Sequence, residues 1–580
     1  MFNHIAVWSL LGALLTACAG RSEVAFDEPV GDVVRACEPR AAAPFELSRH
    51  VLVSDSEGKL PADRHGGTLA EAFRTIMGGY AEATAGSPAR PPRLLFYFNG
   101  GLNSQALVEQ QARRQVPCII ADGYYPVFFV WDTDGLGSYW EQVSSVWDGQ
   151  VDRSFATRAR TPLMVLGNVV SGLGQAPADY FIHGRRFFRA LRREPRCSLV
   201  VREDPDDPQA LDGCAEEQHV TFVDEVGGQI SPEANVVTAP DTDAHEREVG
   251  KFVAYGALWP VRLASTPLAH GLGEAAWTNM VRRTRTTINR SLEFNLDRDV
   301  DGTNPCPEDF REKMRQFPKG TGAFARFFET LLHYYYPDWE LIRSEWHCID
   351  GRDARLDPPT PADEQLDQQI RAALADARIT MIGHSMGAIV INELLDRFRD
   401  LPYADIVVMA SAASMRDTRR VLNRYFEDAP GGEPDTNFYA LMLHPLNDAR
   451  ERQYAGAVPS GSLLMWIDEM YGVPRTPDDK TLGFWPTAES ARRMFGFAAQ
   501  QHMLYRVFSR PQAAMEDPTN PIEHGQFNED DTCFWRPSFW GVGGTSWASR
   551  YAAALPEQAL LPCGERHEAP LRNQVPPAAS

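Results

Sequence analysis

The chain has 580 residues, of which 43% are hydrophobic and 10% aromatic, so it is long enough for a large core and more than one domain. Its formal net charge at pH 7 is −21. Because nucleic acid and anionic lipid head groups both attract positive charge, this balance argues against either as the main partner.

The N-terminal residues have the pattern of an export signal. Ile5–Ala17 is an uncharged apolar run with the length of a signal-peptide core, too short to cross a bilayer comfortably. It ends in Leu15-Thr16-Ala17-Cys18, which resembles the lipobox of bacterial lipoproteins, although no Lys or Arg precedes it. The resemblance implies a signal peptide 1–18, lipidation of Cys18 (palmitate included) and a polar tether 19–44.

The same resemblance implies a place in the bacterial cell envelope. No Asp follows the lipidated cysteine, which favours the outer membrane, with the protein facing the periplasm or the exterior. An ordinary cleaved signal peptide and an uncleaved anchor are the alternatives.

The cysteines agree with export. Eight remain when Cys18 is set aside, and an even number is compatible with disulfide bonds in an oxidising compartment. Neighbours in sequence suggest the pairs Cys197–Cys214, Cys306–Cys348 and Cys533–Cys563. The absence of a CxxC pair argues against a zinc ribbon or a thioredoxin-like site.

Short apolar runs alternate with helical patterns along the rest of the chain. After an alternating edge strand at Phe45–Val53, the expected buried strands are Arg93–Phe98, Pro126–Trp131, Ile379–Ile382, Ile406–Met409, Phe438–Leu443 and Met503–Phe508. Expected helices between them include Ser104–Asp122, Met386–Arg399 and Arg416–Glu427. This order predicts an α/β fold with a doubly wound, mostly parallel sheet.

The stretch between Trp131 and Ile379 is too long for a single crossover. We interpret 135–375 as an inserted, mainly helical cap, which divides the core into 45–134 and 376–565, followed by a polar tail 566–580. Its expected helices are Ser138–Trp147, Trp277–Leu292 and Thr321–Tyr336. Thr161–Ala178 has no charge but contains prolines and glycines, so we expect it to be buried or to face substrate rather than to span a membrane.

The most informative motif is Gly383-His384-Ser385-Met386-Gly387, which lies between an expected strand and an expected helix. It fits G-x-S-x-G, the pattern of a nucleophile elbow, in which a sharp turn exposes one serine hydroxyl. Glycine suits both flanking positions because a side chain there would crowd the turn or the helix packing. The alternative is a glycine-rich turn without chemistry.

A second glycine-rich turn follows an earlier strand. Asn99-Gly100-Gly101-Leu102 comes directly after Arg93–Phe98 and resembles the oxyanion loop of lipases and esterases, with Asn99 in place of His. The resemblance implies that Gly101 or Leu102 supplies one oxyanion N–H and Met386 the other. A plain strand-end turn is the alternative.

A base and an acid are available downstream. His524, in a loop beside Gly525 and after the last expected strand, is the preferred base, and His502 is the fallback. Asp448, just past strand Phe438–Leu443, is the preferred acid, and its rivals are Asp417 and Asp468.

With these residues, the chain resembles the α/β-hydrolase superfamily, specifically its serine esterases and lipases, over 93–131 and 379–540. The resemblance implies a Ser385–Asp448–His524 triad that hydrolyses carboxylic esters, lipids included, through an acyl-enzyme, with no metal or organic cofactor. Amide or thioester hydrolysis and acyl transfer are alternatives on the same fold. A catalytically inactive surface interaction lipoprotein is another, and the oligomeric state stays open.

One acidic loop suggests a separate chemistry. Asp297-Arg298-Asp299-Val300-Asp301-Gly302, with Glu308, fits the pattern of a calcium-binding loop. Pro305 and Pro307 stiffen the segment, so a surface loop without metal is the alternative. Any Ca²⁺ held there would be structural.

Overall fold

The computed structural model describes residues 45–61, 64, 68–147, 150–151, 155–192, 197–200, 237–240, 259–291, 319–336, 361–427, 435–443, 447–448, 451, 461–472, 474–491, 494–508 and 521–540. The expected signal peptide with Cys18, the tether, the Asp297–Glu308 loop and the polar tail lie outside these residues. Within the described part of the chain, no helix combines the length and the apolar character that crossing a membrane requires.

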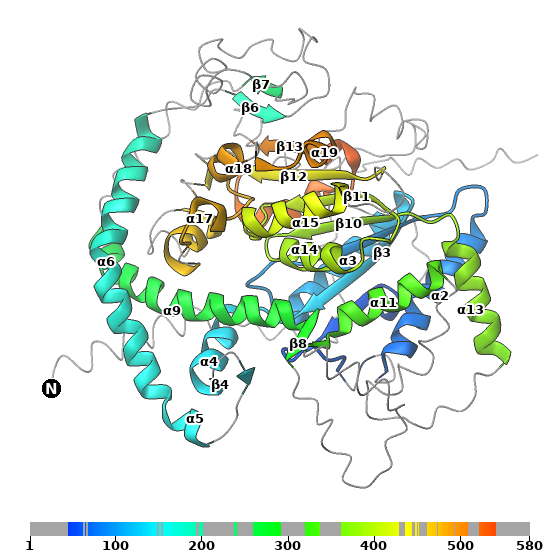
Figure 1. Cartoon of the computed structure of the whole chain (residues 1–580), viewed down its shortest axis with the longest axis horizontal. Coiled ribbons are helices and arrows are strands. Elements are labelled where there is room, and N and C mark those ends of the chain that lie inside the picture. Colours follow the sequence, from blue (N-terminus) through cyan, green and yellow to red (C-terminus); the bar gives the residue numbers. More distant parts are fainter. Residues whose placement is uncertain are drawn as a thin grey trace, which may run out of the picture.

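A sheet of nine strands forms the core (Figure 1). Seven neighbouring strands are parallel, in the order β1 (Val51–Ser54), β3 (Tyr124–Trp131), β2 (Arg93–Phe98), β10 (Ile379–His384), β11 (Tyr403–Met409), β12 (Asn437–Leu443) and β13 (Met503–Phe508). Two further strands, β6 (Cys197–Val200) and β7 (Val237–Pro240), extend it antiparallel beyond β13. The predicted α/β architecture with a mostly parallel sheet is confirmed.

Side chains of β2 alternate between two covered faces, as the two-residue period of a strand requires. Phe96 packs on Phe328 of helix α11 (Ala323–Tyr335), with ring centroids 5.3 Å apart. Tyr97 packs on Phe534 from the other side, with centroids 5.0 Å apart. Both faces are therefore buried, which explains why the strand reads as a continuous apolar run.

Different helices cover the two faces. The face of Phe96 carries α2 (Leu69–Gly86), α11, α13 (Pro361–Leu374), α14 (Gly387–Arg397) and α15 (Met415–Glu427). The face of Tyr97 carries α3 (Gln105–Ala121) and segment 521–540, which are joined where Gln111 and Gln115 donate to the Asn528 carbonyl.

The chain winds in opposite directions from the central pair β2 and β10. After β2 it passes through α3 to β3 on one side, and after β10 it passes through α14 to β11 on the other. Such a switch point leaves a crevice at the carboxyl ends of the two strands, where open α/β sheets bind their ligands.

The last part of the expected insert, which contains α11 and α13, packs in the helix layer that covers one face of the sheet. Phe324, Phe327 and Phe328 of α11 are fully buried against core strands, and α13 packs beside α2. The other described helices of the insert, α4 (Gly135–Ser145), α5 (Phe155–Ala159), α6 (Thr161–Arg192) and α9 (Trp259–Thr286), gather at one end of the molecule (Figure 1).

The segment 161–178 differs from the expectation of burial. It forms the first half of α6, and several of its large apolar side chains face solvent.

Candidate functional site

Ser385 occupies a sharp bend between β10 and α14. Its φ is +50°, in the left-handed region that a residue with a side chain enters at a cost of about 1–2 kcal/mol. Two backbone bonds hold it there: its N–H donates to the Met409 carbonyl at 2.8 Å, and its carbonyl accepts from the Ala412 N–H at 3.0 Å. The Ser385 side chain is buried, and its Oγ has no hydrogen-bond partner among the described residues.

The two glycines of the motif are required by close packing. A Cβ on Gly387 would lie 2.3 Å from the Phe98 carbonyl oxygen, so any side chain would push α14 off strand β2. A Cβ on Gly383 would lie 2.7 Å from Ile391 Cδ1. The spacing of the motif therefore follows from the tight turn of strand into helix.

The loop after β2 lies against the bend. A Cβ on Gly100 would be 3.3 Å from Ser385 Cβ and 2.7 Å from His384 Nδ1, and one on Gly101 would be 2.6 Å from Met386 Sδ. The structure thus brings together two segments that are far apart in sequence. Glycine allows this approach of backbone to backbone.

The three expected oxyanion donors are not equivalent. Leu102 has a φ of +62°, and its N–H donates to the Thr133 carbonyl at 3.1 Å, so that group is already occupied. No acceptor among the described residues takes the N–H of Gly101 or of Met386. This difference favours Gly101 over Leu102 as the loop donor.

His524 is buried close to the bend, at the start of the short helix η11 (His524–Asn528). Its backbone is fixed from both sides: its N–H donates to Glu451 Oε2 at 2.8 Å, and its carbonyl accepts from His384 Nε2 at 3.0 Å. The His384 and His524 rings lie 5.1 Å apart. Neither nitrogen of the His524 ring has a hydrogen-bond partner among the described residues.

Burial keeps both imidazoles neutral. It lowers the pKa of His384 to about 4, and the contact with the His524 carbonyl only partly offsets this. It lowers the pKa of His524 well below the ordinary value, and the neighbouring His384 lowers it further. A neutral imidazole is the form that accepts a proton.

The fallback base lies elsewhere. His502 comes directly before β13, so it is at the amino end of a parallel strand, the sheet edge opposite to Ser385. Its ring stacks on Phe426 with centroids 4.6 Å apart. His502 therefore has a packing role.

Two of the expected acids and one unexpected acid lie close enough to influence one another, and one of them, Glu451, contacts the His524 backbone. Asp448, Glu451 and Asp468 are all buried. Burial raises the pKa of Asp448 well above its ordinary value; the Ser462 side chain partly offsets this rise, and Glu451 and Asp468 add to it. Neither Asp448 oxygen makes a hydrogen bond within the described residues, whereas Asp468 Oδ1 accepts from the Thr481 N–H at 2.8 Å.

The third expected acid is outside this group. Asp417 lies in the first turn of α15, its side chain is 40% exposed, and it pairs with Arg285 at 3.5 Å. These contacts give Asp417 no connection to His524.

The structure brings Ser385, His384, His524 and the loop 99–102 together, and Glu451 contacts the His524 backbone. No hydrogen bond links Ser385 to His524, or His524 to Asp448, among the described residues. Sequence reasoning missed Glu451 and the contact of His384 with the His524 backbone. Only the position of Glu451, three residues after Asp448 in the same loop, pointed to it.

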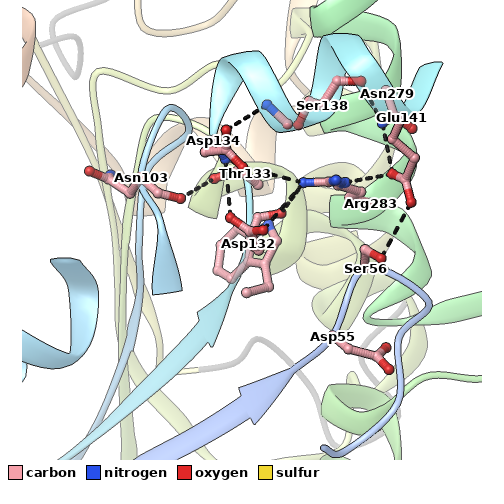
Figure 2. Close-up of polar contacts among 12 residues, drawn as sticks. Asp55, Ser56, Asn103, Asp132, Thr133, Asp134, Ser138, Glu141, Asn279 and Arg283 are labelled. Atoms are coloured by element: carbon pink, nitrogen blue, oxygen red, sulfur yellow. Dashed lines mark hydrogen bonds and ion pairs between the residues drawn. The ribbon is translucent and has the colours of Figure 1, made fainter. Parts of the chain in front are cut away.

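A largely buried ionic cluster lies beside the loop after β2 (Figure 2). Glu141 of α4 accepts from Arg282, Arg283 and Asn279 of α9, at 2.8, 2.8 and 2.9 Å. Burial alone would raise the pKa of Glu141, but Asn279 and the two arginines together hold it below its ordinary value. Glu141 thus stays ionised and ties α4 to α9.

The same cluster reaches the glycine-rich loop. Arg283 Nη1 donates to the Asp132 carbonyl at 3.3 Å, at the end of β3. The next residue, Thr133, donates its N–H to the Asn103 carbonyl at 3.1 Å and accepts from the Leu102 N–H. The backbone of the candidate oxyanion loop is therefore anchored to a paired, buried charge network (Figure 2).

The predicted disulfide and metal sites involve residues other than those of this bend. Cys214, Cys306, Cys348 and Cys563 lie outside the described residues, and Cys533 takes part in a disulfide bond. Within the described residues, no group of three or more His, Cys, Asp or Glu side chains could hold a metal ion. A cavity of about 1240 Å³ opens at the amino ends of the strands, lined in part by Arg93, Thr380 and Asn437, at the edge opposite to Ser385.

Comparison with protein-family profiles, curated proteins and solved structures finds no match to this chain.

Proposed function

We propose that the protein is a serine hydrolase of carboxylic esters, with Ser385 as nucleophile and His524 as general base. The observation that carries the proposal is the Ser385 bend: a strained, buried serine with an unbonded hydroxyl at the switch point of a parallel sheet. Backbone strain at such a place is maintained only when the surrounding structure enforces it, and it recurs at functional sites. An α/β-hydrolase arrangement around this bend is part of the proposal.

In this mechanism Ser385 Oγ attacks the acyl carbonyl carbon while a ring nitrogen of His524 takes its proton. The carbonyl oxygen becomes an oxyanion that accepts from the N–H groups of Gly101 and Met386. Collapse of the intermediate expels the alcohol, which receives the proton from His524. Water then attacks the acyl-enzyme with the same base, releasing the acid and Ser385.

The unsatisfied groups support these roles. A hydrogen bond between Ser385 Oγ and the His524 ring would satisfy two buried atoms that have no partner among the described residues. Catalytic hydrogen bonds are often long in ligand-free enzymes and shorten when substrate is bound. For the acid we favour Asp448, whose two oxygens also lack partners, and Glu451 is the second candidate because it already holds the His524 backbone.

Replacing Ser385 by Ala tests the proposal. Hydrolysis of short-chain nitrophenyl esters should fall by at least about 10³-fold, because a serine nucleophile has no substitute in the site. Labelling by a fluorophosphonate probe should disappear with it. Ser144→Ala, which removes another buried serine whose hydrogen bonds to described residues all lie within its own helix, should retain both. Undiminished turnover by the Ser385→Ala protein would falsify the assignment.

The substrate class needs a separate measurement, because the elbow serves esters, amides, thioesters and acyl transfer alike. We favour esters, and lipid esters among them. A panel of one acyl chain offered as ester, amide and thioester, with and without an alcohol acceptor, separates these reactions. If no member reacts and no probe labels Ser385, the inactive surface protein becomes the better interpretation.

We also propose a lipid anchor at Cys18, on the lipobox-like residues that precede it. Labelled palmitate should enter the chain in a bacterial host and should be lost in Cys18→Ala. Incorporation that persists in this variant excludes Cys18 as the lipidated residue.

A further inference from the structure

Helices α5 and α6 present a set of large apolar side chains to solvent. Phe155 is 87% exposed, Leu163 70%, Leu166 59%, and Val170 and Leu173 each 58%. Single exposed apolar residues are normal on a protein surface, but a contiguous group marks an interaction site.

Four of these residues lie on one face of α6. Leu163, Leu166, Val170 and Leu173 follow one another at steps of three, four and three residues, which align side chains along one helix face. We call this face the apolar stripe. No described residue covers it, as the exposed fractions show.

The opposite face of α6 is already occupied. Gly172 is buried, and a Cβ on Gly271 of α9 would lie 2.0 Å from the Asn168 carbonyl oxygen, so the two helices cross in close contact. Figure 1 shows α6 along one side of the molecule, with α9 reaching it from within. The apolar stripe therefore faces away from the body of the protein.

The charge of this segment is opposite to that of the chain. Phe155–Arg192 contains one acidic residue, Asp179, and six arginines, namely Arg158, Arg160, Arg185, Arg186, Arg189 and Arg192. The whole chain carries a net charge of −21. A locally basic, amphipathic helix on an acidic protein is complementary to an anionic lipid surface, which takes up apolar side chains and attracts arginine.

We propose that α5 and α6 form a docking surface for an anionic lipid interface. Leu163, Leu166, Val170 and Leu173 enter the boundary between head groups and acyl chains, and α6 lies in the plane of the membrane. Asn168, Gln175 and Pro177 interrupt its apolar sequence, which suits an interfacial helix and not a spanning one.

A second copy of the chain fits the stripe less well. A symmetric dimer brings the same surface of both copies together, so two segments of the same net positive charge would lie side by side. The lipid surface instead meets the same arginines with opposite charge. The proposal does not depend on Ser385 being a nucleophile.

Vesicle co-sedimentation tests the docking surface. The full chain carries Cys18→Ser in every sample, which removes the proposed covalent anchor. With phosphatidylcholine vesicles containing phosphatidylglycerol, Leu163→Glu/Leu166→Glu should bind roughly tenfold more weakly or worse, since two apolar contacts become anionic. Leu107→Glu on α3, where the leucine is 56% exposed, is the matched control and should bind like the parent.

A second variant separates charge from apolar contact. Arg158→Gln/Arg160→Gln keeps the stripe, so its binding should weaken on anionic vesicles and change little on pure phosphatidylcholine. Added salt should reduce the parent's binding to anionic vesicles.

Three outcomes overturn the proposal: no binding of the parent to anionic vesicles, equal binding of the stripe variant and the Leu107 variant, or loss of a dimer in the stripe variant with vesicle binding unchanged. The last would assign the stripe to a second copy of the chain.

Discussion

Two buried polar clusters lie at the carboxyl edge of the sheet, and they differ in how fully their groups are paired. Around Glu141, one carboxylate accepts from Asn279, Arg282 and Arg283, and the arginines are neutralised by acidic neighbours. Around Ser385, the serine hydroxyl, both nitrogens of His524 and both oxygens of Asp448 lack partners among the described residues.

This difference is expected if the Glu141 cluster has a structural role and the groups around Ser385 form the proposed active site. A satisfied buried network rigidifies its surroundings, whereas an unsatisfied buried polar atom costs about 1–3 kcal/mol and calls for an explanation. Bound substrate would supply the missing partners around Ser385. In the Glu141 cluster the charged groups are paired, while Ser138 Oγ has no hydrogen-bond partner among the described residues. The contacts of this cluster extend to the loop 99–103.

The largest expected effect concerns the acid of the site. Asp448→Asn should lower ester hydrolysis by about 10³- to 10⁴-fold if this carboxylate orients His524, because the amide no longer fixes the correct tautomer. Rates under saturating substrate measure the change. Glu451→Gln should cost less, since that residue contacts the His524 backbone and not its ring.

Variants of the two other candidate acids serve as controls. Asp468→Asn disturbs a carboxylate already bonded to the Thr481 N–H, and Asp417→Asn changes a half-exposed residue paired with Arg285. Both should retain most activity. A larger loss in Glu451→Gln than in Asp448→Asn transfers the role of the acid to Glu451.

The next effect concerns stability. Glu141→Gln leaves the buried Arg283 and the partly buried Arg282 beside a neutral amide, and breaking such a pair costs up to about 3–5 kcal/mol when both partners are buried. Urea unfolding should show this as a lower midpoint. Glu46→Gln, which removes a carboxylate that is 70% exposed and paired with Arg49, should change stability by under about 1 kcal/mol.

The Glu141 variant also tests whether the Glu141 cluster is separate from the proposed active site. Where it is folded, it should hydrolyse esters at a rate closer to the parent than to Asp448→Asn. A loss of turnover as deep as that of the acid variant, in a fully folded sample, would make the Glu141 cluster part of the site.

The smallest effect is the pH dependence of folding. The pKa of His384 falls from 6.5 to about 4 on burial, so the unfolded chain binds a proton in this interval and the folded protein does not. Stability is therefore retained above pH 6.5 and is lost as the pH falls towards 4, by about 3 kcal/mol at most. His384→Asn should flatten this part of the stability curve.

His50 provides the matched control. Burial lowers its pKa to about 4 as well, but its Nδ1 contacts the Pro126 carbonyl, away from Ser385. His50→Asn should flatten the stability curve equally and leave hydrolysis intact, whereas His384→Asn should also weaken hydrolysis through its contact with His524. Parent-like curves for both variants would show that these histidines do not govern acid unfolding.

The strands of the sheet and the turn at Ser385 could be predicted from the sequence, because each depends on a local pattern of apolar residues or glycines. Arg93–Phe98 and Met503–Phe508 are strands with the predicted bounds, since each is an apolar run buried on one or both faces. The glycines around Ser385 reflect contacts within the turn and with the adjacent strand.

The contacts that hold the loop and His524 in place could not be predicted, because they join segments that are far apart in the sequence and meet only in the folded protein. Nothing in the sequence near Glu141 indicates Arg283, and nothing near His384 indicates the His524 carbonyl. The exposure of Leu163 and Leu166 was missed for a related reason: an apolar helix predicts a covered face, and the sequence alone does not show whether a neighbour covers it.

The pairing of β2 with β10 has a consequence for folding. The candidate oxyanion loop follows the first strand and Ser385 follows the second, with the whole chain between Phe98 and Ile379 separating them. Closing a loop of that length carries an entropic cost on the order of 5 kcal/mol, so this contact is among the slow, non-local steps. Neither half of the chain contains both segments. Recovery of the proposed esterase activity during refolding would therefore report this one long-range pairing, even if local helices and turns form earlier.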